Sequence, residues 1–357
     1  MIKIVTVTPI SKGIGKETLA YFTSRDIKVG ALVTVPLRNR NVPALVMGVE
    51  EVTYSKTDIK AANFKLKKIS ANKGYALLPS FVRATELTSQ YFASKTGAVI
   101  EALVPDTILK NPPTIKITET KNADSKNTQI KQERLLLQAD DDERTSIYKS
   151  LIREEFAKKQ SIFLCTPTIN DAERIAHILS RGIKEHTYIL HSELGKKEIL
   201  SRWKRVLNSK HPVLIIATGT FLSIPREDIG TIIIEKEHSP SYKISYRPFI
   251  DIRTFAEIYT KEQNKRLIFA DFKLRTETLY RKERKEFTDF QIKNASSMAT
   301  IETKLDNVLT AVEPVPKLIG SVGILDEKIK TNRKLLYFSV SSIVGITAKI
   351  LYSYIST

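Results

Sequence analysis

Residues 213–243 read VLIIATGTFLSIPREDIGTIIIEKEHSPSYK and hold two short runs of branched apolar residues, 213–217 and 231–234. Runs without polar alternation are typical of strands buried on both faces of a parallel sheet. Similar runs lie on either side, at 134–138 (RLLLQ), 161–165 (SIFLC), 187–190 (TYIL) and 266–270 (RLIFA). Longer segments, mostly of mixed polar and apolar character, separate them. The sequence therefore predicts a parallel α/β lobe, which we place at residues 133–290.

The region before this lobe has a different pattern. Residues 1–107 carry short alternating apolar runs, such as 31–36 and 44–49, which are broken by glycine and proline. Alternation of this kind predicts a small β-rich domain, closed by an amphipathic helix that starts near residue 79. Residues 108–132 are polar and contain two adjacent prolines, which is typical of a linker.

The C-terminal region, residues 291–357, is charged at first and weakly patterned. Its stretch 335–355, LLYFSVSSIVGITAKILYSYI, approaches membrane-spanning length. Lys349, Gly345 and several hydroxyl side chains dilute it, so a strand and a helix of a truncated domain are favoured over a membrane helix.

The charge of the chain favours polyanionic partners. Its 57 Lys and Arg residues against 39 Asp and Glu residues leave a net charge of +18, and nucleic acid is the leading candidate. A soluble protein that is merely rich in lysine would share this composition. The single cysteine, Cys165, excludes an internal disulfide and a cysteine-based zinc cluster. Together with an N-terminus lacking a signal peptide's apolar core, this fits a cytoplasmic location.

Two successions of motifs resemble the family of primosomal protein N′ (PriA), the replication-restart DNA helicases. HSELGKKEILSRWKRV at 191–206, followed by 213–243, is similar to that family's helicase core. The segments 29–40, 66–69 and 89–105 resemble its 3′-end DNA-binding domain. The resemblance implies a DNA-binding domain followed by one RecA-like lobe of the P-loop NTPase type, with the second lobe truncated. The family's zinc-binding cysteines belong to that downstream region.

The resemblance places the phosphate-binding loop directly after the strand at 135–137. Such a loop needs glycines for close backbone approach, and Lys and Ser/Thr for phosphate and Mg²⁺. Here QADDDERT at 138–145 puts Gln138 and Glu143 at the glycine positions and Arg144 at the lysine position, and keeps only Thr145. Four carboxylates at 140–143 would repel a triphosphate. They also suit a capped helix start, which we favour over metal binding.

The family's Asp-Glu-Glu-His box corresponds to four residues here: Glu235, Lys236, Glu237 and His238. An acid remains at the Mg²⁺ position, but Lys236 replaces the carboxylate expected to activate water. Lys236 is either a surface charge or a partner of the acidic loop. Gly219 occupies the position where the family has an arginine. Residues 269–277, FADFKLRTE, occupy the position of the family's Gly-Ser-Ala-Thr-Pro-Ser motif, which couples hydrolysis to movement. The family uses ATP and Mg²⁺, but these departures predict no cofactor and no metal site here.

DNA contacts are predicted in both domains. Leu37, Arg38 and Lys67 correspond to the family's 3′-end pocket, but of its Phe-Asp-Tyr element only Tyr21 is kept. Basic side chains suit phosphates, and an exposed tyrosine ring suits base stacking. The candidate DNA-binding residues are Tyr21, Arg38, Arg40, Lys65, Lys67, Lys68, Tyr242 and Lys243. The alternatives are that the lysines protect a strand edge and that both tyrosines belong to the core.

These observations favour a non-catalytic, DNA-binding pseudo-helicase of replication restart. Its expected partners are forked or 3′-ended DNA and, further, restart proteins or single-stranded DNA-binding protein; a membrane partner is not expected. Two alternatives stay open. One is an active ATP-dependent 3′–5′ DNA helicase with an unusual nucleotide site, and the other is a protein-interaction scaffold without catalysis.

Overall fold

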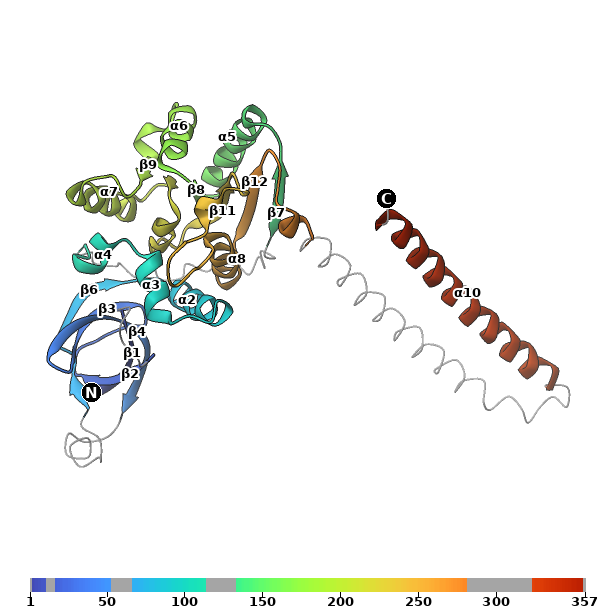
Figure 1. Ribbon diagram of the computed structural model, residues 1–357, viewed down its shortest axis with the longest axis horizontal. Coiled ribbons are helices and arrows are strands. Elements are labelled where there is room, and N and C mark those ends of the chain that lie inside the picture. Colours follow the sequence, from blue (N-terminus) through green and yellow to red (C-terminus); the bar gives the residue numbers. More distant parts are fainter. Residues whose placement is uncertain (1, 11–16, 53–65, 114–132, 281–322, 356–357) are drawn as a thin grey trace. The chain divides into compact units, whose positions relative to one another are not determined.

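The computed structural model describes residues 2–10, 17–52, 66–113, 133–280 and 323–355 (Figure 1). Contacts divide the chain into two units, residues 1–278 and 279–357, and each is considered by itself. The first unit contains two six-stranded sheets. The described part of the second contains a long helix, residues 323–355.

The N-terminal sheet has the order β5-β2-β1-β4-β3-β6. Its strands are β1 (Ile2–Pro9), β2 (Leu19–Thr23), β3 (Ala31–Leu37), β4 (Arg40–Val52), β5 (Lys67–Lys68) and β6 (Ala71–Ala76). Only β2 and β5 pair in parallel. Because just Ile69 and Ser70 separate the two edge strands, the sheet must curl to bring its edges together (Figure 1). The alternating apolar residues fill the inside of this curl, so the predicted β-rich fold is confirmed.

Three helices follow the curled sheet: α2 (Pro79–Tyr91), α3 (Thr96–Leu103) and α4 (Asp106–Lys110). Gly97 lets α3 lie directly against β1, because a Cβ there would be 2.2 Å from the carbonyl oxygen of Pro9. The amphipathic helix predicted near residue 79 is α2.

The second sheet is entirely parallel and has the order β7-β12-β11-β8-β10-β9. Its strands are β7 (Arg134–Gln138), β8 (Ser161–Cys165), β9 (Thr187–Leu190), β10 (Leu214–Ala217), β11 (Ile229–Glu235) and β12 (Arg266–Asp271). All six strands predicted from apolar runs are confirmed. Alternate residues of the central strands enter two separate apolar cores, one on each face of the sheet.

Helices cover both faces of this sheet. The helices are α5 (Asp141–Ala157), α6 (Ile169–Leu179), α7 (Lys196–Asn208) and α8 (Ile252–Gln263), with short 3₁₀ turns η1 (Lys184–His186), η2 (Gly219–Ser223) and η3 (Pro240–Tyr242). Residues of α5 and α6 share the core of one face, and residues of α7 and α8 share that of the other. The arrangement is a RecA-like α/β lobe.

The second face of the lobe also receives side chains from the N-terminal region. The Phe81 ring on α2 contacts Phe255 and Tyr259 on α8 edge-on, with centroids 5.4 and 5.7 Å apart. The indole N–H of Trp203 on α7 donates to the Tyr75 hydroxyl on β6 at 3.2 Å. Helix α4 lies across the start of the predicted linker 108–132, of which 114–132 lie outside the described residues, as does the expected boundary at 290. Those boundaries stay predictions.

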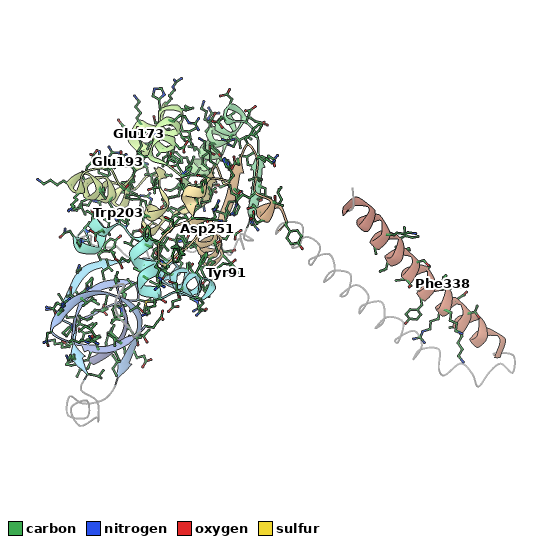
Figure 2. All side chains as sticks on the ribbon, viewed as in Figure 1. Tyr91, Glu173, Glu193, Trp203, Asp251 and Phe338 are labelled. Atoms are coloured by element: carbon green, nitrogen blue, oxygen red, sulfur yellow. The ribbon has the colours of Figure 1, made fainter. Side chains whose placement is uncertain are left out.

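The helix of the second unit is α10 (Gly323–Ile355). A strand followed by a helix was expected at 335–355, and that expectation is wrong, because no proline interrupts the segment and a helix satisfies its backbone locally. Many of its apolar side chains are exposed, including Phe338 at 75% (Figure 2). Within the described residues, the structure contains no helix of sufficient length and apolar character to cross a membrane.

Candidate functional site

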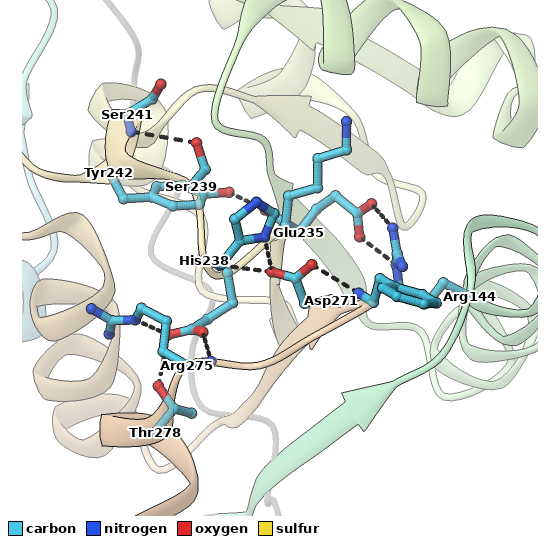
Figure 3. Close-up of polar contacts among 12 residues, drawn as sticks. Arg144, Glu235, His238, Ser239, Ser241, Tyr242, Asp271, Arg275 and Thr278 are labelled. Atoms are coloured by element: carbon cyan, nitrogen blue, oxygen red, sulfur yellow. Dashed lines mark hydrogen bonds and ion pairs between the residues drawn. The ribbon is translucent and has the colours of Figure 1, made fainter.

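Two of the residues aligned with the nucleotide site, Arg144 and Glu235, meet near the carboxyl ends of β7, β11 and β12 (Figure 3). Arg144, from the first turn of α5, reaches Glu235 at the end of β11, with Nη2 2.9 Å from Oε1. Both side chains are almost fully buried, at 1% and 2% exposure. The arginine therefore fills the space beside the carboxylate that the resemblance assigns to Mg²⁺.

Further contacts fix the Arg144–Glu235 pair. Arg144 donates to the carbonyl oxygen of Ala139 at 2.7 Å and to Asp141 Oδ1 at 2.6 Å, and the Tyr148 hydroxyl donates to Glu235 Oε2 at 2.5 Å. Burial alone would lower the pKa of Arg144. The hydrogen bonds to Glu235 and the charge of Glu235 outweigh this effect, so the pKa of Arg144 is raised. Burial, followed by the charge of Glu235, raises the pKa of Tyr148 well above its ordinary value. The site is therefore an internally neutralised cluster.

The N-terminus of α5 is occupied by the chain's own carboxylates. The Asp140 side chain accepts the N–H of Glu143 at 2.8 Å, which makes it the N-cap, and residues 141–143 provide three acids in the first turn. The expected capped helix start is confirmed. In a phosphate cradle these amides and the helix dipole would face the ligand instead. The first turn of α5 thus carries three acidic side chains, and one of its free amides is already bound by Asp140.

The other residues of this loop take part in local structure. Gln138 and Glu143 are exposed, at the end of β7 and the start of α5. The Thr145 hydroxyl donates to the carbonyl oxygen of Asp142 at 2.9 Å, within the helix. In the described part of the chain, the side chain of Glu235 is hydrogen-bonded by Arg144 and Tyr148 and by none of these three residues.

Lys236 has a partner other than the one anticipated. Its Nζ lies 2.5 Å from Asp171 Oδ1 on α6, whereas the acidic loop is paired through Asp141 with Arg144 and Arg174. The direct ion pair of Lys236 is therefore with Asp171, while its charge, after those of Arg144 and Arg174, also contributes to the lowered pKa of Asp141 in the acidic loop. Lys236 adopts a left-handed φ of 51° where the chain turns after β11.

The two remaining residues of the box bind neighbouring loops. Glu237 is fully buried and accepts from Arg275 Nε at 2.7 Å and from the Thr278 hydroxyl at 2.6 Å. His238 lies 2.6 Å from Asp271 Oδ2 at the end of β12 through Nδ1 (Figure 3). These contacts join the carboxyl ends of β11 and β12.

Gly219, where the family has arginine, lies under α8. A Cβ at this position would be 2.6 Å from Cγ2 of Ile252. No larger side chain fits without movement of α8 or of Ile252.

The basic candidates of the N-terminal sheet lie near its edges and turns. Arg38 lies in the β3–β4 turn, Arg40 begins β4, Lys67 and Lys68 form β5, and all four are exposed. Lys65 lies outside the described residues. Tyr21 is 4% exposed, belongs to the inner core and donates its hydroxyl to the carbonyl oxygen of Pro36 at 3.1 Å. The structure therefore contradicts base stacking by Tyr21, because neither face of its ring is open.

Tyr242 is likewise buried. Its hydroxyl reaches the carbonyl oxygens of Cys165 and Glu235 at 2.9 and 2.6 Å, so it packs within the lobe and does not face DNA. Lys243 beside it is exposed and begins a loop that the Lys243–Asp251 bridge closes.

Sequence reasoning missed the aromatic residues of this loop. Tyr246 and Phe249 are 58% and 57% exposed, on either side of the exposed Arg247. Phe249 is held outward by a left-handed φ of 54° and by its N–H, which donates to the carbonyl oxygen of Tyr246 at 2.7 Å. The signal was present in the interleaved basic and aromatic residues 243–249, KISYRPF. We name residues 243–249 the aromatic loop.

Metal ligands are not clustered in the described residues. No group of three or more His, Cys, Asp or Glu side chains there is arranged to hold a metal ion. The imidazole of His191 is buried and lies 4.0 Å from Glu173, and His238 is held by Asp271.

The fold and site define the class of protein as a RecA-like α/β lobe preceded by a curled β-rich sheet. Comparison with known proteins shows a more specific similarity. No family model matches the chain. Replication restart protein PriA of Helicobacter pylori is 29% identical over 245 residues, which are 66% of this chain and 37% of that protein. PriA of Rickettsia prowazekii is 22% identical over 277 residues, 73% of this chain and 42% of that protein.

The chain thus spans well under half the length of the PriA proteins it matches. Among solved structures, the C-terminal domain of Dbp5 from S. cerevisiae is 13% identical, with a TM-score of 0.33, and the match covers 44% of this chain and 85% of that domain.

Proposed function

We propose that this chain is a DNA-binding protein of replication restart that does not hydrolyse ATP. The similarity to proteins named replication restart protein PriA supports the restart role. Forked or 3′-ended DNA as ligand, restart proteins or single-stranded DNA-binding protein as partners, and a cytoplasmic location are parts of the same proposal.

One observation carries the catalytic half of the proposal. The buried Arg144–Glu235 pair neutralises the carboxylate that would hold Mg²⁺, and Asp140 caps the helix that would receive phosphate. Binding of Mg²⁺ at Glu235 would require Arg144 to leave its buried partner first, which opposes binding. The residues at the site thus disfavour ATP binding in the ground state.

The DNA-binding half rests on exposed basic side chains in two places. Arg38, Arg40, Lys67 and Lys68 belong to the N-terminal sheet, while Lys243 and Arg247 belong to the aromatic loop. Cations bind phosphates of any sequence, and Tyr246 and Phe249 are exposed aromatic residues of the kind that stack on bases. Because Tyr21 and Tyr242 are buried, we propose Tyr246 and Phe249 as the stacking residues instead.

An ATPase assay tests the first half. We expect the purified protein to show no ATP turnover above background, with or without single-stranded DNA. DNA-stimulated hydrolysis that Thr145→Ala or Lys236→Ala abolishes would contradict the proposal and favour the active helicase.

Titration of labelled fork DNA across a series of salt concentrations tests the second half. We expect affinity to fall steeply with salt and to weaken in Lys67→Glu and Lys243→Glu. Lys204→Glu, an exposed charge reversal on α7, is the matched control and should bind nearly as the unaltered protein does. Equal and weak affinity for fork DNA and heparin, unchanged by the first two variants, would favour the scaffold alternative.

A further inference from the structure

A small cavity opens at the end of β2, beside the junction of β5 and β6. It has a volume of about 250 Å³ and is lined by Thr23, Arg25, Ile27, Lys68, Ile69 and Asn72, among others. It contains none of Leu37, Arg38 and Lys67, the residues aligned with the family's 3′-end pocket. The cavity is therefore a separate feature of the curled sheet.

The cavity is lined mainly by polar side chains, and two apolar ones, Ile27 and Ile69, also border it. Ile27 and Ile69 are 4% and 7% exposed and belong to the inner core. Arg25 and Lys68 are exposed at the mouth, and Asn72 is half-buried. An apolar surface next to cations suits a ligand with a flat apolar part and an anionic part.

The two cations have no carboxylate partners in the part of the chain that the structure describes. Among the described residues, no ion pair joins Arg25 or Lys68 to a carboxylate. By contrast, ion pairs with carboxylates are formed by Arg144, Arg226 and Arg253. Asp26, next in sequence to Arg25, is bound by Lys3 at 2.9 Å, and this hydrogen bond lowers the pKa of Asp26. Among the described residues, therefore, no acidic side chain is paired with Arg25 or Lys68 at this cavity.

We propose that this cavity binds the terminal nucleotide of a DNA strand through a phosphate monoester. Arg25 and Lys68 contact the phosphate, and the base lies over Ile27 and Ile69. A terminal monoester carries nearly two negative charges at neutral pH and an internal diester only one, so a pair of cations prefers the terminal group. A cavity of about 250 Å³ suits one nucleotide and not a duplex. This inference rests on the proposed DNA-binding function.

Methyl NMR of the full chain, labelled at isoleucine, tests the cavity directly. Deoxyadenosine monophosphate should shift the Ile27 and Ile69 methyl signals with saturation, whereas deoxyadenosine should bind about tenfold more weakly. Arg25→Ala should remove this difference, and Lys28→Ala, an exposed neighbour outside the cavity, should keep it. The signals of Ile233 in the other sheet report whether each variant is folded. Unchanged Ile27 and Ile69 signals in the folded protein would overturn the inference.

Binding of labelled oligonucleotides identifies the strand end. Three otherwise identical single strands carry a 5′-phosphate, a 3′-phosphate or hydroxyls at both ends. We expect one phosphorylated strand to bind about tenfold more tightly than the hydroxyl-ended strand, and Arg25→Ala to abolish only that preference. Equal affinity of all three strands would refute end recognition while leaving general DNA binding intact. Failure of every strand to bind would refute the proposed function, and the nucleotide titration would still decide the cavity.

Discussion

Arg144 and Glu235 form a buried ion pair across 91 positions of the chain, with 2.9 Å between Nη2 and Oε1. The pair joins the start of α5 to the end of β11. Removing one partner should destabilise the fold strongly, because the other charge then stays buried and unpaired. Replacing both partners by apolar residues need not be costly.

We expect Arg144→Ala to lower the free energy of unfolding by about 3–5 kcal/mol, because Glu235 would keep its burial and lose its cation. Urea denaturation followed by fluorescence of Trp203, the single tryptophan, measures this change. Lys149→Ala, an exposed position on α5, is the control and should change stability by less than about 0.5 kcal/mol. The double variant Arg144→Met with Glu235→Leu should recover most of the loss. A loss below about 1 kcal/mol in Arg144→Ala would show that the pair is not structurally important.

The Lys236–Asp171 pair predicts a pH-dependent effect. Burial alone would raise the pKa of Asp171, but hydrogen bonds from Lys236 and Thr168 outweigh burial and hold it below the ordinary value. A carboxyl whose pKa is lower in the folded protein adds stability above its unfolded pKa of about 4, and this stability is lost as pH falls through the folded value.

Lys236→Met should therefore lower the free energy of unfolding at pH 7 by about 1–2 kcal/mol. The difference from the unaltered protein should shrink at about pH 3 and vanish at lower pH, as Asp171 becomes protonated. Urea titrations at both pH values measure it, with Lys149→Met as control. A difference that is the same at both pH values would rule out the ionic contribution.

The strands of the lobe were predictable because strands buried on both faces consist of consecutive apolar residues. A run such as 231–234 reads as buried on both faces, and β11 is indeed covered by helices on each. The strand order was not predictable, because β7 pairs with β12, which lies far along the chain, and no local pattern specifies that pairing.

The site was predictable in position but not in its contacts. Comparison with the family's motifs placed Arg144 and Glu235 in one site, yet no local pattern showed that Lys236 would pair with Asp171, which lies 65 positions earlier in the chain. For Tyr21 the sequence left both base stacking and core burial open, and the structure supports burial. In a strand, a shift of one residue decides which face a ring occupies, and the irregular sequence before β2 did not fix that register.

Reintroducing the family's arginine at Gly219 should destabilise the fold. The new Cβ alone would lie 2.6 Å from Ile252 Cγ2, so Gly219→Arg should cost about 1–3 kcal/mol. Gly219→Ala should already carry part of this cost. Adding Ile252→Ala to Gly219→Arg should lessen the overpacking, which a double-mutant cycle detects as non-additivity. Additive effects of the two changes would show that Ile252 is not the obstacle.

The hydrogen bond from Trp203 to Tyr75 makes stability of the curled sheet and of the α/β lobe interdependent. Tyr75→Phe keeps the packed ring but leaves the indole N–H buried without its acceptor, which should cost about 1–3 kcal/mol. Because Phe81 also packs on α8, unfolding of the two sheets should remain coupled. Trp203 fluorescence and far-UV circular dichroism should therefore shift to lower urea concentration together. Tyr337→Phe on α10 is the matched control, since its ring is exposed. A shift in fluorescence alone would mean that the two sheets unfold separately.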